Sequence, residues 1–134
     1  MGASAAGQPI GTPHRRTYRA EGTLTYVTRG RGVMQGTADD QCKVPTGGAV
    51  RCLGVVEESP AAVGDPVSVV TLGEVIAISG QTALVAGLPV KVEAEGDFIS
   101  CAAADVECVG YAVTTAAADG DEFVMFVLPI LKKS

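Results

Sequence analysis

The sequence predicts an all-β fold, a small antiparallel β-sandwich or barrel with two similar hairpin repeats. Three observations support this prediction. The chain has 134 residues, and its 17 glycines and 7 prolines are too many turn formers for a helical bundle of this size. Short apolar stretches alternate with these turn residues. Finally, segment 52–72 matches segment 108–128 without a gap, at an offset of 56 residues.

The repeat is a scaffold pattern rather than a chemical motif. It conserves apolar positions and one Gly-Asp step, which is Gly64-Asp65 in the first copy and Gly120-Asp121 in the second. An aspartate after a glycine can accept hydrogen bonds from nearby backbone N–H groups, so these four residues are interpreted as turns. A catalytic pair of the two aspartates is the alternative. We expect the two segments to superpose as hairpins.

Nine stretches, including the strands of the two hairpins, are interpreted as strands or extended segments, and the first one begins at Thr17. Each is apolar or alternating and is bounded by Gly, Pro or Asp. Their ranges are 17–27, 49–57, 66–72, 74–79, 82–86, 88–94, 97–101 and 122–128, with 106–114 completing the second hairpin. The Ala-rich runs 102–104 and 116–118 could each form one helical turn.

Charge divides the chain in two. Residues 1–36 hold five Arg and one acid, whereas residues 37–134 hold five Lys or Arg and fourteen Asp or Glu. We predict an extended basic arm over residues 1–32, mobile in the free protein, and a β-rich domain over residues 33–134. The arm would contact an acidic partner, or it would be a solvated tail that keeps the protein soluble. Its candidate partner-binding residues are Arg15, Arg16, Tyr18, Arg19, Arg29 and Arg31.

The cysteines show no C-x-x-C spacing and have no histidine nearby, which argues against a zinc site. In a reducing cytosol we expect all four to be free and mostly buried thiols, with a disulfide formed after release from a cell as the alternative. They are Cys42, Cys52, Cys101 and Cys108.

The sequence contains no recognisable catalytic or cofactor motif. Its one histidine, His14, lies in the expected arm, where nothing would hold a general base in place. Asp39-Asp40 and the series Glu93, Glu95, Asp97 lack the spacing of a calcium loop and are interpreted as solvated edges. We therefore predict no enzyme activity, no cofactor and no metal site. The acidic body argues against nucleic-acid binding, and no run approaches the ~20 apolar residues of a membrane span.

The body resembles the capsid cement, or head decoration, proteins of tailed phages. The resemblance covers residues 33–131. It rests on segment 109–128, in which a strand, a glycine, an Ala-rich loop, Gly-Asp and a second strand follow one another, and on segment 87–96. It implies a virion structural protein that binds the outer capsid surface and stabilises contacts between capsomers, with terminal arms that touch the shell and no catalytic residues.

The same resemblance implies the partners and the location. The partners would be the major capsid protein and the chain itself, as a homotrimer. The protein would be made in the host cytoplasm, which agrees with residues 1–6 lacking the basic and apolar regions of a signal peptide. The alternative is a small β-barrel component of the tail or baseplate, or a cellular oligomeric binding domain without catalytic activity.

Overall fold

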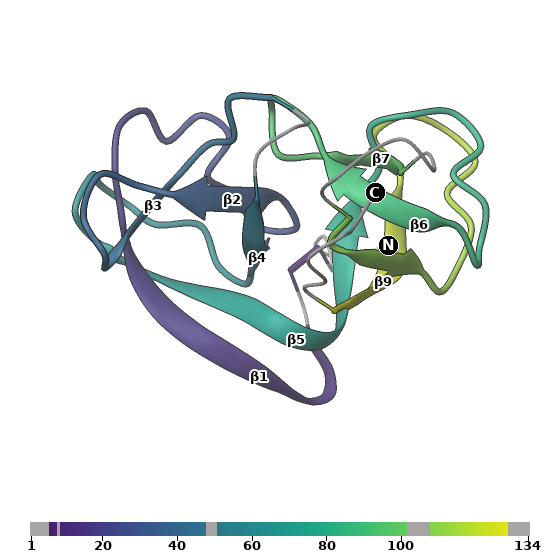
Figure 1. Cartoon of the computed structure of the whole chain (residues 1–134), viewed down its shortest axis with the longest axis horizontal. Coiled ribbons are helices and arrows are strands. Elements are labelled where there is room, and N and C mark those ends of the chain that lie inside the picture. The colour runs from purple at the N-terminus through teal and green to yellow at the C-terminus, as the bar shows by residue number, and fades with distance from the viewer. Residues whose placement is uncertain (1–5, 8, 48–50, 102–107, 129–134) are drawn as a thin grey trace.

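The computed structural model describes residues 6, 7, 9–47, 51–101 and 108–128, and the regular elements in these ranges are all β-strands (Figure 1). The all-β prediction is confirmed. None of the described residues belongs to a helix long and apolar enough to cross a membrane. The strands are β1 (Pro9–Ala20), β2 (Gly32–Gln35), β3 (Gln41–Lys43), β4 (Cys52–Val56), β5 (Pro66–Ile78), β6 (Pro89–Val92), β7 (Phe98–Ser100), β8 (Gly110–Ala112) and β9 (Glu122–Val127).

Strands β1 to β5 form a closed ring, which we call barrel 1. β1 lies parallel to β3 and antiparallel to β5, and the pairs β3–β2, β2–β4 and β4–β5 are antiparallel. Because the ring closes, barrel 1 has no free sheet edge among these strands. Its interior is small and mostly aliphatic, as expected from a chain that is only 4% aromatic. The buried residues are Tyr18, Ala20, Val27, Val33, Cys42, Val56, Val67 and Val69.

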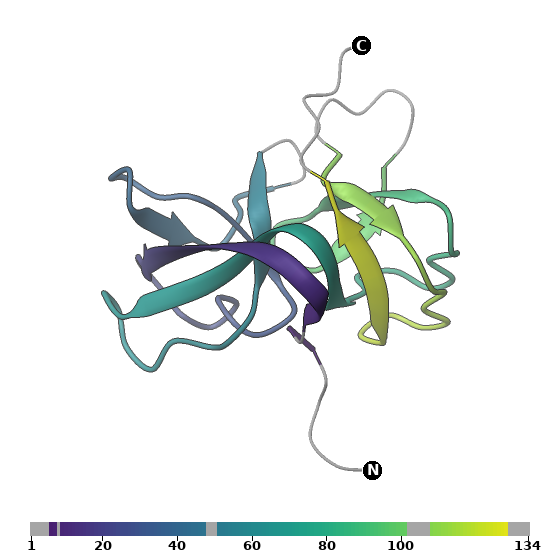
Figure 2. The same cartoon turned by 90° about the horizontal axis from the view of Figure 1, so that it is seen from below.

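The second half of β5 continues into a second ring, barrel 2, in the order β5-β9-β8-β6-β7. All of its strand pairs are antiparallel, and a parallel bridge between Ser79 and Phe98 joins β7 back to the end of β5. Figures 1 and 2 show the two barrels side by side. The core of barrel 2 includes Leu84, Val90, Phe98, Ala112, Phe123 and Met125.

Strand β5 belongs to both barrels. Its first half pairs with β1 and β4, and from Gly73 onward it pairs with β9. In Figure 1 it accompanies β1 and then turns into the half that holds β6, β7 and β9. We expected two strands separated at Gly73, but the strand is continuous. Gly73 has a φ of +122°, and an added Cβ would press on Pro13 of β1, so the changeover requires a glycine.

The predicted hairpin repeat is confirmed by the strand register. In the first hairpin Val55 pairs with Val70. In the second, Tyr111 pairs with Phe126, exactly 56 residues later. Both hairpins thus use the same backbone pairing with different side chains.

The repeat extends beyond the hairpins to the whole barrel. In barrel 1 the parallel partners that close the ring are Ala20 and Cys42. In barrel 2 the corresponding partners are Ser79 and Phe98. The backbone N–H of Gly64 donates to the carbonyl oxygen of Ala20 at 2.8 Å, and Gly120 donates to Ser79 at the same distance. The fold is therefore a tandem pair of equivalent five-stranded barrels, with β5 as the last strand of one and the first of the other.

Among the described residues, most of the predicted arm belongs to barrel 1. Residues 9–20 form β1, which pairs with β5 along most of its length, and residues 21–32 lead directly into β2. The reason lies in the alternation of β1: Tyr18 and Ala20 are buried inside barrel 1, while the arginines between and before them remain exposed. The expected division at residue 32 is therefore wrong for the described residues, because barrel 1 includes both sides of it.

Other elements also differ from expectation. Strands β2 and β3 were not predicted, because each is only three or four residues long and carries few apolar side chains. Segment 82–86 is not a strand but contributes the single bridge from Leu84 to Ala116. That bridge also excludes a helical turn at 116–118. The run 102–104 lies outside the described residues.

Two of the cysteines are paired, which corrects the expectation of four free thiols. Cys101 and Cys108 form a disulfide with Cα atoms 5.9 Å apart. The pairing follows from β6, because β7 and β8 lie on either side of it and bring their adjoining ends together at Pro89 and Val90. Cys42 and Cys52 are free and buried, as expected. Burial raises the pKa of the Cys42 thiol to about 11 and that of Cys52 to about 12, so both are unreactive at neutral pH.

The duplication predicts matched effects for two glycines. Gly54 faces the carbonyl oxygen of Val70, and Gly110 faces that of Phe126, and in both places a Cβ would overlap the oxygen. We expect Gly54→Ala and Gly110→Ala each to lower the free energy of unfolding by about 2–3 kcal/mol in urea denaturation. Gly47→Ala is the control, since a Cβ there meets nothing within 4 Å. If either core glycine tolerates alanine as Gly47 does, close strand approach is not a shared requirement of the barrels.

The disulfide predicts how many cysteines react with an alkylating reagent before and after reduction. Unfolded, non-reduced protein should react with two equivalents of an alkylating reagent, and reduced protein with four, as read by mass spectrometry. Peptide mapping should place the two early adducts on Cys42 and Cys52. Reduction should also lower the free energy of unfolding, by about 2–4 kcal/mol. Four adducts on oxidised, non-reduced protein would contradict the pairing.

Candidate functional site

Two of the predicted partner-binding arginines lie on the outer face of barrel 1 and already hold carboxylates of the same chain. The Nε of Arg15 lies 2.8 Å from Oε1 of Glu57, and the Nε of Arg19 lies 2.8 Å from Oδ2 of Asp40. Both arginines remain exposed, so solvent screens each pair and its contribution to stability is small. The hydrogen bond from Arg19 holds the pKa of Asp40 below its ordinary value.

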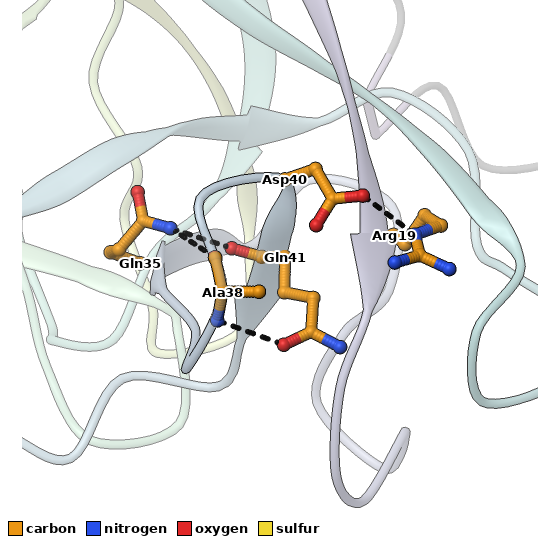
Figure 3. Close-up of polar contacts among 5 residues, drawn as sticks. All are labelled: Arg19, Gln35, Ala38, Asp40 and Gln41. Carbon is orange, nitrogen blue, oxygen red and sulfur yellow. Dashed lines mark hydrogen bonds and ion pairs between the residues drawn. The ribbon is translucent and has the colours of Figure 1, made fainter.

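The turn between β2 and β3 presents Asp40 to Arg19 (Figure 3). The side-chain amide of Gln35 donates to the carbonyl oxygens of Ala38 and Gln41, at 2.7 and 3.3 Å. The side-chain oxygen of Gln41 in turn accepts the backbone N–H of Ala38 at 3.0 Å. These hydrogen bonds fix the turn, so the Arg19–Asp40 ion pair connects β1 to a rigid β2–β3 turn.

Two more arginines lie where segments from different parts of the chain meet. The Nε of Arg29 donates to the carbonyl oxygen of Ala6 at 3.1 Å. Arg31 donates to the carbonyl oxygen of Glu95 in barrel 2 at 3.0 Å, and its guanidinium lies 5.2 Å from the ring centre of Tyr26. Both side chains are partly buried. Each arginine thus makes a hydrogen bond within the chain, and the bond of Arg31 links barrel 1 to barrel 2.

Arg16 is placed differently, beside an open hollow at the surface of barrel 1. Its guanidinium lies 5.5 Å from the ring centre of the buried Tyr18. The hollow has a volume of about 450 Å³ and has a second exposed arginine, Arg51, on its wall. We call it the basic hollow, and its lining residues are Arg16, Tyr18, Gln35, Arg51, Cys52, Leu53 and Thr71.

No carboxylate lines the basic hollow, and within the described ranges neither Arg16 nor Arg51 forms an ion pair. Two guanidinium groups at one opening suit a carboxylate of a partner, because each can donate in bidentate fashion. Sequence reasoning included Arg16 with the other arginines of β1 but missed Arg51. Arg51 is a lone basic residue before β4, and only the closing of the barrel brings it near Arg16.

The four turn residues do not form a common site. Gly64 and Asp65 end the loop of the first hairpin, whereas Gly120 and Asp121 end that of the second. In each turn the aspartate N–H donates to the carbonyl oxygen three residues earlier at 3.1 Å. The side chain of Asp121 also accepts the N–H of Ala118 at 3.0 Å. These hydrogen bonds are those expected of turn residues, so the interpretation of the four residues as turns explains them without a catalytic role.

Barrel 2 has a hollow of opposite charge. Its volume is about 390 Å³, and it is lined by Gly80, Glu93, Ala94, Glu95, Asp97 and Asp119. The carboxyl groups of Glu93 and Asp97 converge over Gly80, where a Cβ would contact both. Burial, and then the charge of Asp97, raise the pKa of Glu93 to about 7. Among the residues that the structure describes, no group of three or more His, Cys, Asp or Glu is placed to hold a metal ion.

The two barrels differ in charge as a whole. Residues 9–72 hold seven Lys or Arg and six Asp or Glu, for a net charge of +1. Residues 73–128 hold one Lys and nine Asp or Glu, for a net charge of −8. The division of charge thus follows the barrels rather than an arm and a body.

The sequence matches the phage cement protein family over residues 15–128, which span nearly all of both barrels. The chain belongs to this family. The suspected kinship with capsid cement proteins is therefore confirmed, and with it a structural role in a phage capsid. A search of the curated proteins finds no match.

Family membership also bears on β1. The matched region begins at Arg15 inside this strand, so the basic residues of β1 are part of the cement domain rather than an appendage to it. Residues 15–32, which the resemblance to cement proteins left out, lie within the matched region. The family match and the strand pairing agree that barrel 1 starts with β1.

The Glu93–Asp97 pair predicts a pH dependence of stability. Because the pKa of Glu93 is raised from its ordinary 4.5 to about 7, the folded protein keeps a proton that the unfolded chain releases between these values. Stability therefore falls as pH rises through this window. We expect Glu93→Gln to raise the free energy of unfolding at pH 8 and to change it little at pH 4, as measured by urea denaturation. Glu58→Gln, at an exposed site in barrel 1, should not show this difference.

Proposed function

We propose that this protein binds the outer surface of a phage capsid and stabilises the contacts between its capsomers. The observation that carries the proposal is the family match over residues 15–128, which spans nearly all of both barrels and all of the residues that line the basic hollow. In this proposal the protein acts by docking alone, with no catalysis, no cofactor and no nucleic-acid contact.

The structure supports a docking role in two ways. Two rings of hydrogen-bonded strands joined through β5 give a stiff body. A stiff body loses little conformational entropy on binding, so more of the contact energy is available to hold the shell together. The strong net negative charge of barrel 2 favours an orientation in which barrel 1 approaches acidic groups of the shell and barrel 2 points away.

We propose the basic hollow as the point of contact with the major capsid protein. Of the six residues expected to bind a partner, Arg15, Arg19 and Arg31 have acceptors within the chain, Arg29 bonds to Ala6, and Tyr18 is buried. Arg16, together with Arg51, is best placed to donate to a carboxylate outside the chain. Copies on the shell would also associate with one another, as a homotrimer, after synthesis in the host cytoplasm.

A tail or baseplate component, or a cellular binding domain, would use the same barrels on another partner. A binding experiment with purified expanded capsids that lack tails distinguishes these two functions from the proposed capsid binding. Co-sedimentation of the protein with such capsids, at a fixed number of copies per capsomer, supports cement. If the protein stays in the supernatant at low salt, capsid binding is the wrong assignment.

The basic hollow predicts which arginines the shell requires. We expect Arg16→Ala/Arg51→Ala to weaken co-sedimentation with capsids by roughly tenfold, because two exposed charge contacts are lost. The loss should shrink as salt rises, since screening weakens the same contacts in the unchanged protein. The matched control is Arg15→Ala/Arg19→Ala, which removes equal charge from the same barrel but from arginines already paired with Glu57 and Asp40.

Thermal unfolding of both double variants checks that each is folded. Equal losses of binding in the two variants would mean that net charge, rather than the basic hollow, determines attachment. Unchanged binding of Arg16→Ala/Arg51→Ala at every salt concentration would remove the hollow from the interface.

A further inference from the structure

The outer face of the first hairpin is covered by barrel 2. Val56 and Val69 point into barrel 1, so Val55 and Val70 beside them point outward. Yet Val55 and Val70 are both 0% exposed and belong to the hydrophobic core that is centred on barrel 2. Outward-facing side chains of one barrel are thus buried by the other.

Close contacts on the neighbouring strand show how tightly the barrels meet. Gly32 of β2 pairs with Val55. An added Cβ at Gly32 would lie 2.9 Å from a methyl group of Val92 and 3.0 Å from the ring of Phe98, both in barrel 2. The N–H of Gly32 also donates to the carbonyl oxygen of Gly96 at 2.6 Å. This face of barrel 1 is therefore an apolar docking surface that the chain fills with its own second barrel.

The equivalent face of barrel 2 is uncovered in the described structure. In barrel 2, Tyr111 occupies the position equivalent to Val55 of barrel 1, and Phe126 occupies the position equivalent to Val70. Tyr111 is 41% exposed and Phe126 is partly exposed. Their rings stack with centroids 5.5 Å apart. Within the described residues no third barrel lies over them.

Further apolar side chains extend this face. Pro89 pairs with Tyr111 as Gly32 pairs with Val55, and it is exposed. Val113 follows Tyr111, and Leu128 follows Phe126, by two residues, the spacing that returns a strand to the same face. They are 36% and 37% exposed. We call this set the exposed apolar face, and it consists of Pro89, Tyr111, Val113, Phe126 and Leu128. Stacked aromatic rings within an exposed apolar patch are typical of the centre of a protein–protein interface.

We propose that the exposed apolar face is the self-association surface of this protein, and that barrel 1 of a second copy covers it. The chain offers a precedent, because barrel 2 covers the equivalent face of barrel 1, which shows that a barrel of this fold can pack on that face. Charge selects the covering barrel. Barrel 2 against barrel 2 would join two units of net charge −8, whereas barrel 1, at +1, brings no such repulsion.

Contacts of barrel 2 on barrel 1 are head-to-tail. Such contacts use two different surfaces of each subunit, and they close into a ring when the rotation between subunits permits it. A ring of three is the arrangement proposed above for the shell. The inference deepens that proposed self-association and is independent of how the ring attaches to a capsid.

The test compares Tyr111→Ser/Phe126→Ser with Val63→Ser in solution without capsids. Val63 is 62% exposed on a loop of barrel 1, so its variant also removes an exposed apolar group. Light scattering across a concentration series should show a multimer for the unchanged protein and for Val63→Ser. Tyr111→Ser/Phe126→Ser should require a roughly tenfold or higher concentration to associate. The single variant Tyr111→Ser guards against loss of folding in the double variant, and thermal unfolding verifies both.

Three outcomes overturn the inference: a monomer for the unchanged protein at all concentrations, unaltered association of Tyr111→Ser/Phe126→Ser, or loss of capsid binding without any self-association, which would assign the face to the capsid. The capsid-binding variant Arg16→Ala/Arg51→Ala should still associate, so the two proposals fail separately.

A photo-cross-linking residue at position 111 tests the orientation of the two copies. Cross-linked peptides should come from residues 9–72 of a second copy, and cross-links between two copies of position 111 would contradict the head-to-tail arrangement.

Discussion

The backbone hydrogen bonds of β5 are the constraint on which the rest of the structure depends. One continuous strand, Pro66–Ile78, completes the ring of barrel 1 and begins the ring of barrel 2. Removal of β5 would open both rings and expose two sets of sheet edges. Because the strand passes through both barrels, it also determines which outer face of barrel 1 meets barrel 2. The burial of Val55 and Val70 follows from this connection rather than from their own sequence.

Duplication preserved the backbone of the barrel but not its surface. The turns, the register and the close approach at Gly54 and Gly110 occur in both copies, since strand pairing allows little variation there. Outward-facing positions are free of this restriction and have diverged. They give barrel 1 a hollow lined by two exposed arginines, and barrel 2 an acidic hollow and a stacked aromatic pair. One fold used twice thus yields two chemically distinct ends.

The sequence predicted the fold class, both hairpins and the family, because these depend on apolar alternation and on glycines that recur at a fixed offset. It did not predict β2 or β3, nor the equivalence between the parallel pairings that close the two rings, β1 with β3 and the end of β5 with β7. There, the equivalent residues share position without identity, as Cys42 and Phe98 do. The arm was predicted from charge, yet arginines on the outer face of a strand cost nothing in a barrel, so charge could not distinguish strand from arm. The basic hollow and the disulfide both join residues that only the folded barrels bring together.

The two proposed surfaces depend on different forces, and this difference suits the proposed role of holding a shell together. The proposed contacts from Arg16 and Arg51 are electrostatic, so they would guide approach to the shell and would weaken with salt. Contacts through Tyr111 and Phe126 are apolar and persist when charges are screened. Since the basic hollow lies on barrel 1 and the aromatic pair on barrel 2, one subunit can engage the shell and a neighbour at once. In this proposal the shared strand β5 would transmit strain between the two contacts through backbone hydrogen bonds, because β5 joins the barrels without a linker.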